Sequence, residues 1–188
     1  MTRIAIAFAQ DFADWEPALL TAAARSYLGV EICYASPDGQ PVVSMGGLNV
    51  TPHAGYDALD PADTDALVIP GGMSWEKGTA ADIASLVHRF RDRGRVIGGI
   101  CAAASALAGT GVLNDVAHTG NSLGSHRAYP GYRGEHLYRA QSQAVSDGGF
   151  VTAPGSAPVS FAAEILKALG LFGPEAEAEL RVFAAEHR

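Results

Sequence analysis

The sequence predicts a single α/β domain, a flavodoxin-like or Rossmann-like sandwich with helices on both faces of a mostly parallel sheet. Short apolar runs typical of strands buried on both faces alternate with helical segments along the chain. At 188 residues the chain has the length of one ordinary domain, and no internal repeat or low-complexity linker divides residues 1–188. A hydrophobic content of 48% is enough for a core that needs no disulfides or metals.

The first half of the chain alternates strand and helix and then adds a small hairpin. Asp14 is placed to cap the first helix, Pro17 falls in its first turn, where a missing N–H costs nothing, and Gly29 lies just past its end. The elements expected here are a strand at 4–9, a helix at 15–27, a strand at 30–35, a hairpin at 42–50 and, after an acidic linker at 57–65, a strand at 66–69.

The second half continues the alternation and closes with two helices. Thr79 with Asp82 resembles a capping box, and Gly94 ends the helix that it opens. The run Ser146-Asp147-Gly148-Gly149 is a strong hairpin signal. The elements expected here are a helix at 79–93, a strand at 95–100, a helix at 102–108, a long polar loop at 121–134, a hairpin of 138–145 with 150–153, and helices at 158–169 and 174–186.

Charge and composition exclude several classes of function. The formal net charge is −7 at pH 7, which argues against nucleic acid or an anionic membrane as a partner. No apolar run approaches the ~18 residues of a membrane span, and the apolar N-terminal stretch is too short for a signal peptide, so we expect a cytoplasmic protein. Two cysteines are too few for a disulfide framework, and with six histidines they show no metal-ligand spacing. We therefore expect no metal and no cofactor.

The segment 96–107 carries the most specific chemical signal. A buried strand ends, Cys101 makes the turn, and a helix begins at once, which is the arrangement of a nucleophile elbow. The residues two before and two after such a turn crowd together and must be small, and here they are Gly99 and Ala103. The helix N-terminus beside Cys101 favours a thiolate. The sequence therefore predicts a reactive cysteine at the carboxyl edge of the sheet.

An alternative interpretation of Cys101 is a buried structural cysteine in a tight strand-to-helix turn, because free cysteine is among the most buried residue types. Cys33 fits that description better. It lies in the middle of a strand with no helix terminus beside it, and we expect it to be part of the core.

Three motifs in order resemble the ThiJ/PfpI superfamily: Asp14-Trp15-Glu16 after the first strand, Ile69-Pro70-Gly71-Gly72, and Gly99-Ile100-Cys101-Ala102. That superfamily includes the Parkinson-associated deglycase and has the class I glutamine amidotransferase-like fold. The resemblance covers nearly the whole chain. It implies a homodimer, since family members are usually homodimers, but it does not specify the activity, because one fold hosts many chemistries.

The resemblance also implies roles for individual residues. Glu16 corresponds to a carboxyl group that points at the Cys101 sulfur, where repulsion and desolvation keep it protonated so that it can donate a hydrogen bond or shuttle a proton. Glu16 can equally be an ordinary first-turn acid that interacts with the helix dipole. The N–H groups of Gly71, Gly72 and Ala102 correspond to an oxyanion hole, although the glycine pair is also typical of a plain turn after a strand.

Departures from the family pattern argue against some activities. Ala102 stands where the protease-like branch has histidine, and the segment 153–158 lacks the His-x-Glu pair of glutamine amidotransferases. The histidine of the deglycase and glyoxalase branch falls at or near Gly120, so that base is missing. His118, two residues earlier, and His126, in the polar loop, are the candidates to replace it, and each can equally have an ordinary core or surface role.

We therefore expect a cysteine-dependent enzyme that acts on a small reactive carbonyl, amide or nitrile-like substrate by hydrolase or lyase chemistry, with Cys101 as nucleophile and Glu16 managing the proton. The alternative is an oxidative-stress protein whose Cys101 is oxidised without dedicated turnover. A third hypothesis is a relic of the fold that binds a metabolite or a partner protein.

Overall fold

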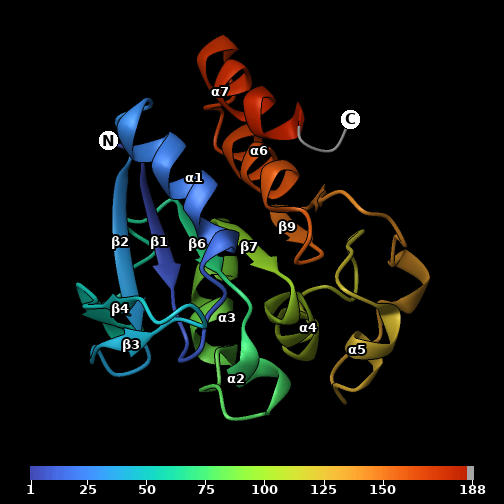
Figure 1. Cartoon of the computed structure of the whole chain (residues 1–188). Helices are drawn as coiled ribbons and strands as arrows, with labels where there is room; N and C mark the ends of the chain where they lie inside the picture. The colour runs from blue at the N-terminus through green and yellow to red at the C-terminus, as the bar shows by residue number, and fades with distance from the viewer. Residues whose placement is uncertain (186–188) are drawn as a thin grey trace.

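A computed structural model describes residues 1–185 and shows an α/β domain built on a seven-stranded sheet in the order β5-β2-β1-β6-β7-β9-β8 (Figure 1). Its pairings are parallel except for the antiparallel pair at the β8 edge. The strands are β1 Arg3–Ala7, β2 Glu31–Ser36, β3 Val42–Val43, β4 Asn49–Val50, β5 Ala54–Gly55, β6 Ala66–Ile69, β7 Val96–Ile100, β8 Val145–Asp147 and β9 Phe150–Ala153.

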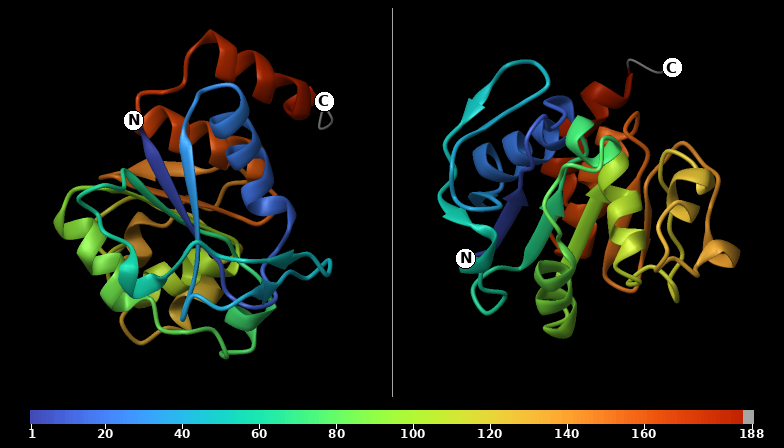
Figure 2. Two further views of the ribbon diagram at one scale, coloured as in Figure 1. Left: turned by 90° about the vertical axis from the view of Figure 1, so that its left-hand side faces the viewer. Right: turned by 90° about the horizontal axis from the view of Figure 1, so that it is seen from below.

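Helices cover both faces of this sheet, as predicted. They are α1 Trp15–Ser26, α2 Met73–Glu76, α3 Ala84–Asp92, α4 Ala102–Gly109, α5 Leu123–Arg127, α6 Pro158–Ala168 and α7 Pro174–Ala184, with short 3₁₀ helices at Tyr56–Ala58 and Glu135–Leu137. Helices α1, α6 and α7 pack together on one face, and α2, α3 and α4 lie on the other (Figures 1 and 2). Within the described part of the chain, no helix is long and apolar enough to cross a membrane.

The core consists of two apolar clusters, one on each side of the sheet. Successive side chains of β1 point to opposite faces, so Ile4 and Ile6 pack under α1 and α6 while Ala5 and Ala7 face α3 and α4. All four are fully buried. This burial on both faces explains why the strand is a continuous apolar run rather than an alternating one.

The parallel register brings the chemically interesting segments to one edge of the sheet. Ile69 pairs with Gly99, and Ile100 pairs with Ala153, so β6, β7 and β9 end side by side. The connections that follow β1, β6, β7 and β9 therefore meet at this edge. They carry, in that order, the start of α1, the glycine pair, Cys101 and the turn before α6.

Several predicted elements differ from the structure. The helix expected from Thr79 begins only at Ala84, and Thr79 does not cap it: the N-cap residue is Ile83, which makes no side-chain cap, and the Asp82 carboxylate accepts a 2.9 Å hydrogen bond from the Ala84 N–H. Asp14 does not cap α1 either. Its carboxylate accepts hydrogen bonds from the Ser44 hydroxyl and, at 2.8 Å, from the Gly46 N–H. Asp14 therefore joins the β3–β4 hairpin to the start of α1.

The largest differences between the predicted and the observed secondary structure lie between α4 and β9. The predicted polar loop at 121–134 contains α5, which Ser122 caps by accepting a hydrogen bond from the Ser125 N–H. The predicted strand 138–145 is wrong except at Val145: β8 is Val145–Asp147, and Ser146 and Asp147, which were expected in the turn, pair with β9. The hairpin with β9 is confirmed. The short helix α2 was missed altogether. The predicted end of the last helix at 186 lies outside the described residues.

Candidate functional site

Cys101 lies at a sharp turn between β7 and α4. Its backbone has φ 61° and ψ −131°, a conformation that a side-chain-bearing residue adopts only under constraint. The crowding expected of a nucleophile elbow is present: a Cβ on Gly99 would lie 2.5 Å from Leu107 Cδ1 and 3.3 Å from the Ala103 carbonyl oxygen. The side chain of Cys101 is half-buried at the edge of the sheet, whereas Cys33 is buried within β2, as predicted.

Glu16 reaches this cysteine from the first turn of α1 and is fully buried. Its Oε2 accepts a 2.5 Å hydrogen bond from the Gly71 N–H. Its Oε1 has no hydrogen-bond partner among the described residues and lies on the side of the thiol: a Cβ on Gly155 would be 3.3 Å from Oε1 and 2.8 Å from Cys101 Sγ. The fold thus places a buried carboxyl group beside the sulfur.

Burial and mutual repulsion determine the protonation of this pair. Burial raises the pKa of Glu16 to about 7. Burial, and then the negative charge of Glu16, raise the pKa of Cys101 above its ordinary value. The helix N-terminus acts in the predicted direction, because the Ala102 N–H lowers the pKa of the thiol, but its effect is outweighed. The predicted effect of the helix N-terminus on the pKa of Cys101 is therefore present, but the predicted thiolate is not favoured, because burial and Glu16 raise that pKa by more.

Two glycines make the close approach of β6 to the elbow possible. A Cβ on Gly71 would lie 2.7 Å from Cys101 Cβ, and one on Gly72, where φ is 148°, would collide with the Asp11 carbonyl. Because the Gly71 N–H already donates to Glu16, the predicted role of Gly71 as an oxyanion donor must be corrected: it holds the carboxyl group. The predicted donors that remain are Gly72 and Ala102.

Neither predicted histidine contacts the thiol. His118 and His126 are fully buried and stack on each other with ring centroids 5.6 Å apart. His118 Nε2 is 2.8 Å from the Tyr132 hydroxyl, and His126 Nδ1 is 3.0 Å from Ser105 Oγ. Burial lowers the pKa of both imidazoles, that of His126 to about 4. A buried neutral ring bonded elsewhere cannot swing in as a base, so the expectation of a replacement histidine is corrected.

The side chain that does contact the sulfur is Asn121, which the sequence analysis missed. Its Nδ2 lies 3.2 Å from Cys101 Sγ, and its Oδ1 accepts a 2.9 Å hydrogen bond from the Gly155 N–H. The signal was present in the sequence, since Asn121 directly follows Gly120, where the family histidine falls. Asparagine does not titrate, so an acid–base pattern in the sequence does not mark it.

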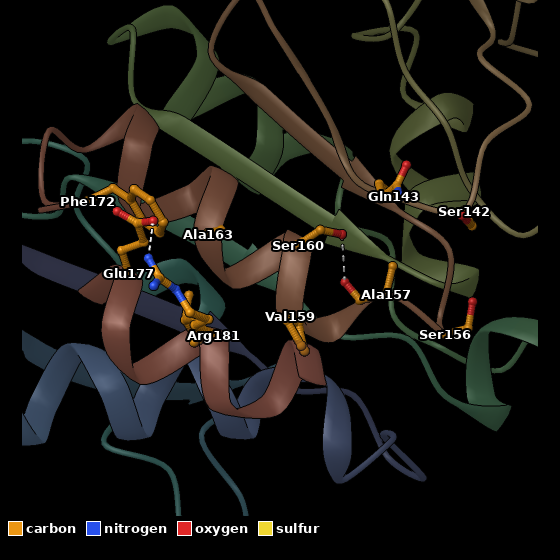
Figure 3. A pocket seen from close by; sticks show the side chains of 12 residues that line it. Ser142, Gln143, Ser156, Ala157, Val159, Ser160, Ala163, Phe172, Glu177 and Arg181 are labelled. Atoms are coloured by element: carbon orange, nitrogen blue, oxygen red, sulfur yellow. Dashed lines mark hydrogen bonds and ion pairs between the residues drawn. The ribbon is translucent and has the colours of Figure 1, made fainter. Parts of the chain in front are cut away.

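One groove of the surface is lined by residues other than Cys101. A groove of about 620 Å³ runs between α6, α7 and the segment 142–143 (Figure 3). Arg181 and Glu177, which form an ion pair, line it together with Phe172. Among residues 1–185, no group of three His, Cys, Asp or Glu side chains is arranged to hold a metal ion.

Comparisons with known proteins agree with this architecture. A model of the DJ-1/PfpI family matches residues 2–168. Two Bacillus subtilis (strain 168) proteins are similar: uncharacterized protease YoaZ, 32% identical over 170 residues (86% of this chain, 80% of that protein), and uncharacterized protease YdeA, 33% identical over 167 residues (87% and 81%).

Solved structures match over nearly the whole length. The DJ-1 superfamily protein Atu0886 from Agrobacterium tumefaciens is 80% identical over 100% of both chains, with a TM-score of 0.99. A thiJ/pfpI family protein from Bacillus anthracis is 27% identical over 96% of both chains, with a TM-score of 0.82.

Proposed function

The chain belongs to the DJ-1/PfpI family, and from this membership and the site geometry we propose that it is a cysteine-dependent enzyme with hydrolase or lyase chemistry. The proposed substrate is a small molecule with a reactive carbonyl, amide or nitrile-like carbon. One observation carries the proposal: a half-exposed cysteine on a strained elbow faces a fully buried carboxyl group whose pKa is raised to about 7. A carboxyl group with that pKa can both take and return a proton near neutral pH.

The proposed reaction uses these groups in sequence. The thiol proton of Cys101 passes to the Glu16 carboxylate as the sulfur attacks the electrophilic carbon of the substrate. The negative charge that develops on the substrate oxygen or nitrogen is met by the N–H groups of Gly72 and Ala102. The Glu16 carboxylic acid then returns the proton to that atom or, with an amide, to the amine that leaves as the C–N bond breaks. Water attacks the carbon of the Cys101 adduct, a proton passes from the water through Glu16 to the sulfur, and cleavage of the C–S bond releases the product and restores the thiol.

Peptide hydrolysis and glutamine hydrolysis fit the site less well. The similar Bacillus proteins carry the name protease, but in this chain Ala102 follows the cysteine. The two histidines of the sheet edge are bonded to Ser105 and Tyr132 rather than to the thiol. Expulsion of a peptide amine needs a well-placed general acid, and neither histidine supplies one. The acid that the site offers is Glu16, which we assign to a small substrate.

Oxidation of Cys101 is the alternative function. A half-exposed sulfur can be oxidised to sulfenic or sulfinic acid without a general base. The oxidised form arises from the thiolate, however, and the raised pKa of Cys101 lowers the thiolate fraction at neutral pH. This balance favours the enzyme over the sensor.

A turnover screen with two cysteine variants tests the proposal. We expect wild-type protein to convert at least one member of a panel of small aldehydes, amides and isonitriles, and Cys101→Ser to lose that activity by about 1,000-fold or more. Cys33→Ala serves as the control and is expected to keep it. Equal rates for wild type and Cys101→Ser would refute the enzyme, and oxidation of Cys101 without any turnover would favour the alternative.

We propose that the protein acts as a homodimer in the cytoplasm, where thiols remain reduced. A hydrophobic patch supports the dimer: Trp15, Val43, Met45 and Leu48 are exposed by 49%, 37%, 46% and 60%, and Asp14 holds their hairpin against the start of α1. Large exposed apolar patches on soluble domains usually mark interfaces. The net charge of −7 argues against nucleic acid or a membrane as the partner.

Substitution within this patch is expected to dissociate the dimer. Leu48→Glu places a charge in the centre of the proposed interface, so we expect sedimentation velocity to shift from dimer to monomer. Val182→Glu, at an exposed position on α7 that is 69% accessible, is the matched control and is expected to leave the dimer intact. A wild-type protein that sediments as a monomer, or a dimer that tolerates Leu48→Glu, would contradict this assignment.

A further inference from the structure

The side chain of Asn121 bridges two parts of the site that are distant in sequence. Its amide lies between Cys101 at the start of α4 and Gly155 in the turn after β9. The backbone N–H of Gly155 can only donate, so the atom of Asn121 that faces it must be the oxygen. The NH₂ group therefore points to the sulfur, and the orientation of the amide is fixed by its partner.

Gly155 is itself held by hydrogen bonds to both of its backbone polar groups. Its N–H donates to Asn121, and its carbonyl oxygen accepts a 3.0 Å hydrogen bond from Trp15 Nε1. A Cβ at this position would lie 2.8 Å from Cys101 Sγ, so the backbone passes directly against the sulfur. The Asn121 amide, the Gly155 backbone and the Trp15 indole are thus joined by hydrogen bonds beside the thiol.

The buried aromatic cluster behind the site fixes the backbone that carries Asn121. The Gly120 carbonyl accepts a 3.1 Å hydrogen bond from the Tyr138 hydroxyl, and the Thr119 N–H donates to Thr152 Oγ1 at 2.8 Å. The ring of His126 packs against Gly120 so closely that a Cβ there would collide with it. This packing gives His126 a positioning role and explains why a histidine at position 120 would not fit.

The polar groups around the sulfur shift the pKa of Cys101 in opposite directions. Glu16 of α1 is the ionisable group that faces it, and the charge of Glu16 raises the pKa of Cys101. The Ala102 N–H of α4 and the amide of Asn121 lower that pKa. A hydrogen bond to an ionised acceptor is roughly twice as strong as one between neutral groups, so the amide binds the thiolate more tightly than the thiol.

We propose that Asn121 is a catalytic residue that holds the Cys101 thiolate by a hydrogen bond from its side-chain amide, in an orientation set by the Gly155 peptide. It neither takes nor gives a proton. The proton released by the thiol goes to Glu16, and the amide stays bonded to the sulfur as the sulfur attacks. The assignment rests on the proposed nucleophilic role of Cys101 and adds a hydrogen-bond donor to the thiolate at a site where His118 and His126 are bonded elsewhere.

The pH dependence of Cys101 alkylation by iodoacetamide tests the assignment without any substrate. Asn121→Asp keeps the bond to the Gly155 N–H but places a carboxylate oxygen against the sulfur. We expect alkylation at pH 7 to fall by about tenfold or more and its pH profile to move upward. Asn121→Ala, which introduces no charge, is expected to shift the profile in the same direction by less. Gln40→Glu, the same amide-to-acid change at an exposed position, is expected to leave the profile unchanged.

The outcomes separate this assignment from the proposed function. A wild-type pH profile in both Asn121 variants would overturn the role of Asn121, whether or not the protein turns over a substrate. A shifted profile in a protein that converts no aldehyde, amide or isonitrile would support Asn121 and refute the enzyme. If Asn121→Asp does not fold, as judged by thermal unfolding, the profile of Asn121→Ala decides.

Discussion

Replacing Gly155 by alanine will reduce turnover by about 100-fold or more, because the added methyl group occupies the space of the nucleophile. The new Cβ would lie 2.8 Å from Cys101 Sγ, 3.0 Å from Cys101 Cβ and 3.3 Å from Glu16 Oε1. The first of these distances is too short for real atoms, so the sulfur or the turn must move. Either displacement breaks the contacts of the sulfur with Glu16 and Asn121.

The measurement is kcat/KM together with the rate of Cys101 alkylation, and both are expected to fall. Gly173→Ala is the control, because a Cβ there would meet nothing within 4 Å. Thermal unfolding of both variants verifies that the fold survives. A Gly155→Ala protein with wild-type kinetics would show that the turn after β9 does not confine the thiol.

Replacing Glu16 by glutamine will reduce kcat/KM by about 100- to 10,000-fold, because glutamine keeps the shape of the side chain and removes the group that moves the proton. The amide oxygen of glutamine can still accept the hydrogen bond from the Gly71 N–H, so the elbow keeps its support. The loss is expected in kcat more than in KM. Wild-type turnover in Glu16→Gln would remove the carboxyl group from the mechanism.

The same substitution is expected to stabilise the protein at alkaline pH. Burial raises the pKa of Glu16 from 4.5 to about 7, so the folded protein binds this proton more tightly than the unfolded chain does. The resulting stabilisation is complete below pH 4.5 and is lost as the pH rises through about 7. At pH 8 the wild type therefore carries a penalty of about 1–3 kcal/mol that glutamine avoids. Urea unfolding at pH 5 and pH 8 measures it, and an equal difference between wild type and variant at both values would contradict it.

The fold and the nucleophile could be predicted from the sequence because their signals are local. Each strand of the sheet is a short apolar run, and Gly99, Cys101 and Ala103 lie within five residues of each other. The steric requirement of an elbow is therefore visible in one segment. Glu16 and the glycine pair needed the family resemblance, because nothing in their own segments shows that these segments meet.

The parts that could not be predicted depend on contacts between distant segments. Asn121 meets Gly155 across 34 residues and Cys101 across 20 residues. Its sign in the sequence is its place next to Gly120, where the family histidine falls, and that sign depends on the family resemblance. His118 and His126 look like candidate bases in the sequence because histidine titrates near neutral pH. Only the packing of their rings in the core shows that they are buried and neutral.

The central claim is that Cys101 and Glu16 share one negative charge near neutral pH, and the pH profile of Cys101 alkylation in the Cys33→Ala background tests it most directly. Two coupled groups release their protons in separate steps. We predict that the alkylation rate rises in a first step near pH 7, where burial has placed the pKa of Glu16, and again at a distinctly higher pH. Glu16→Gln is expected to show a single step. A single step near the ordinary thiol value of ~8.5, unchanged by Glu16→Gln, would contradict the account.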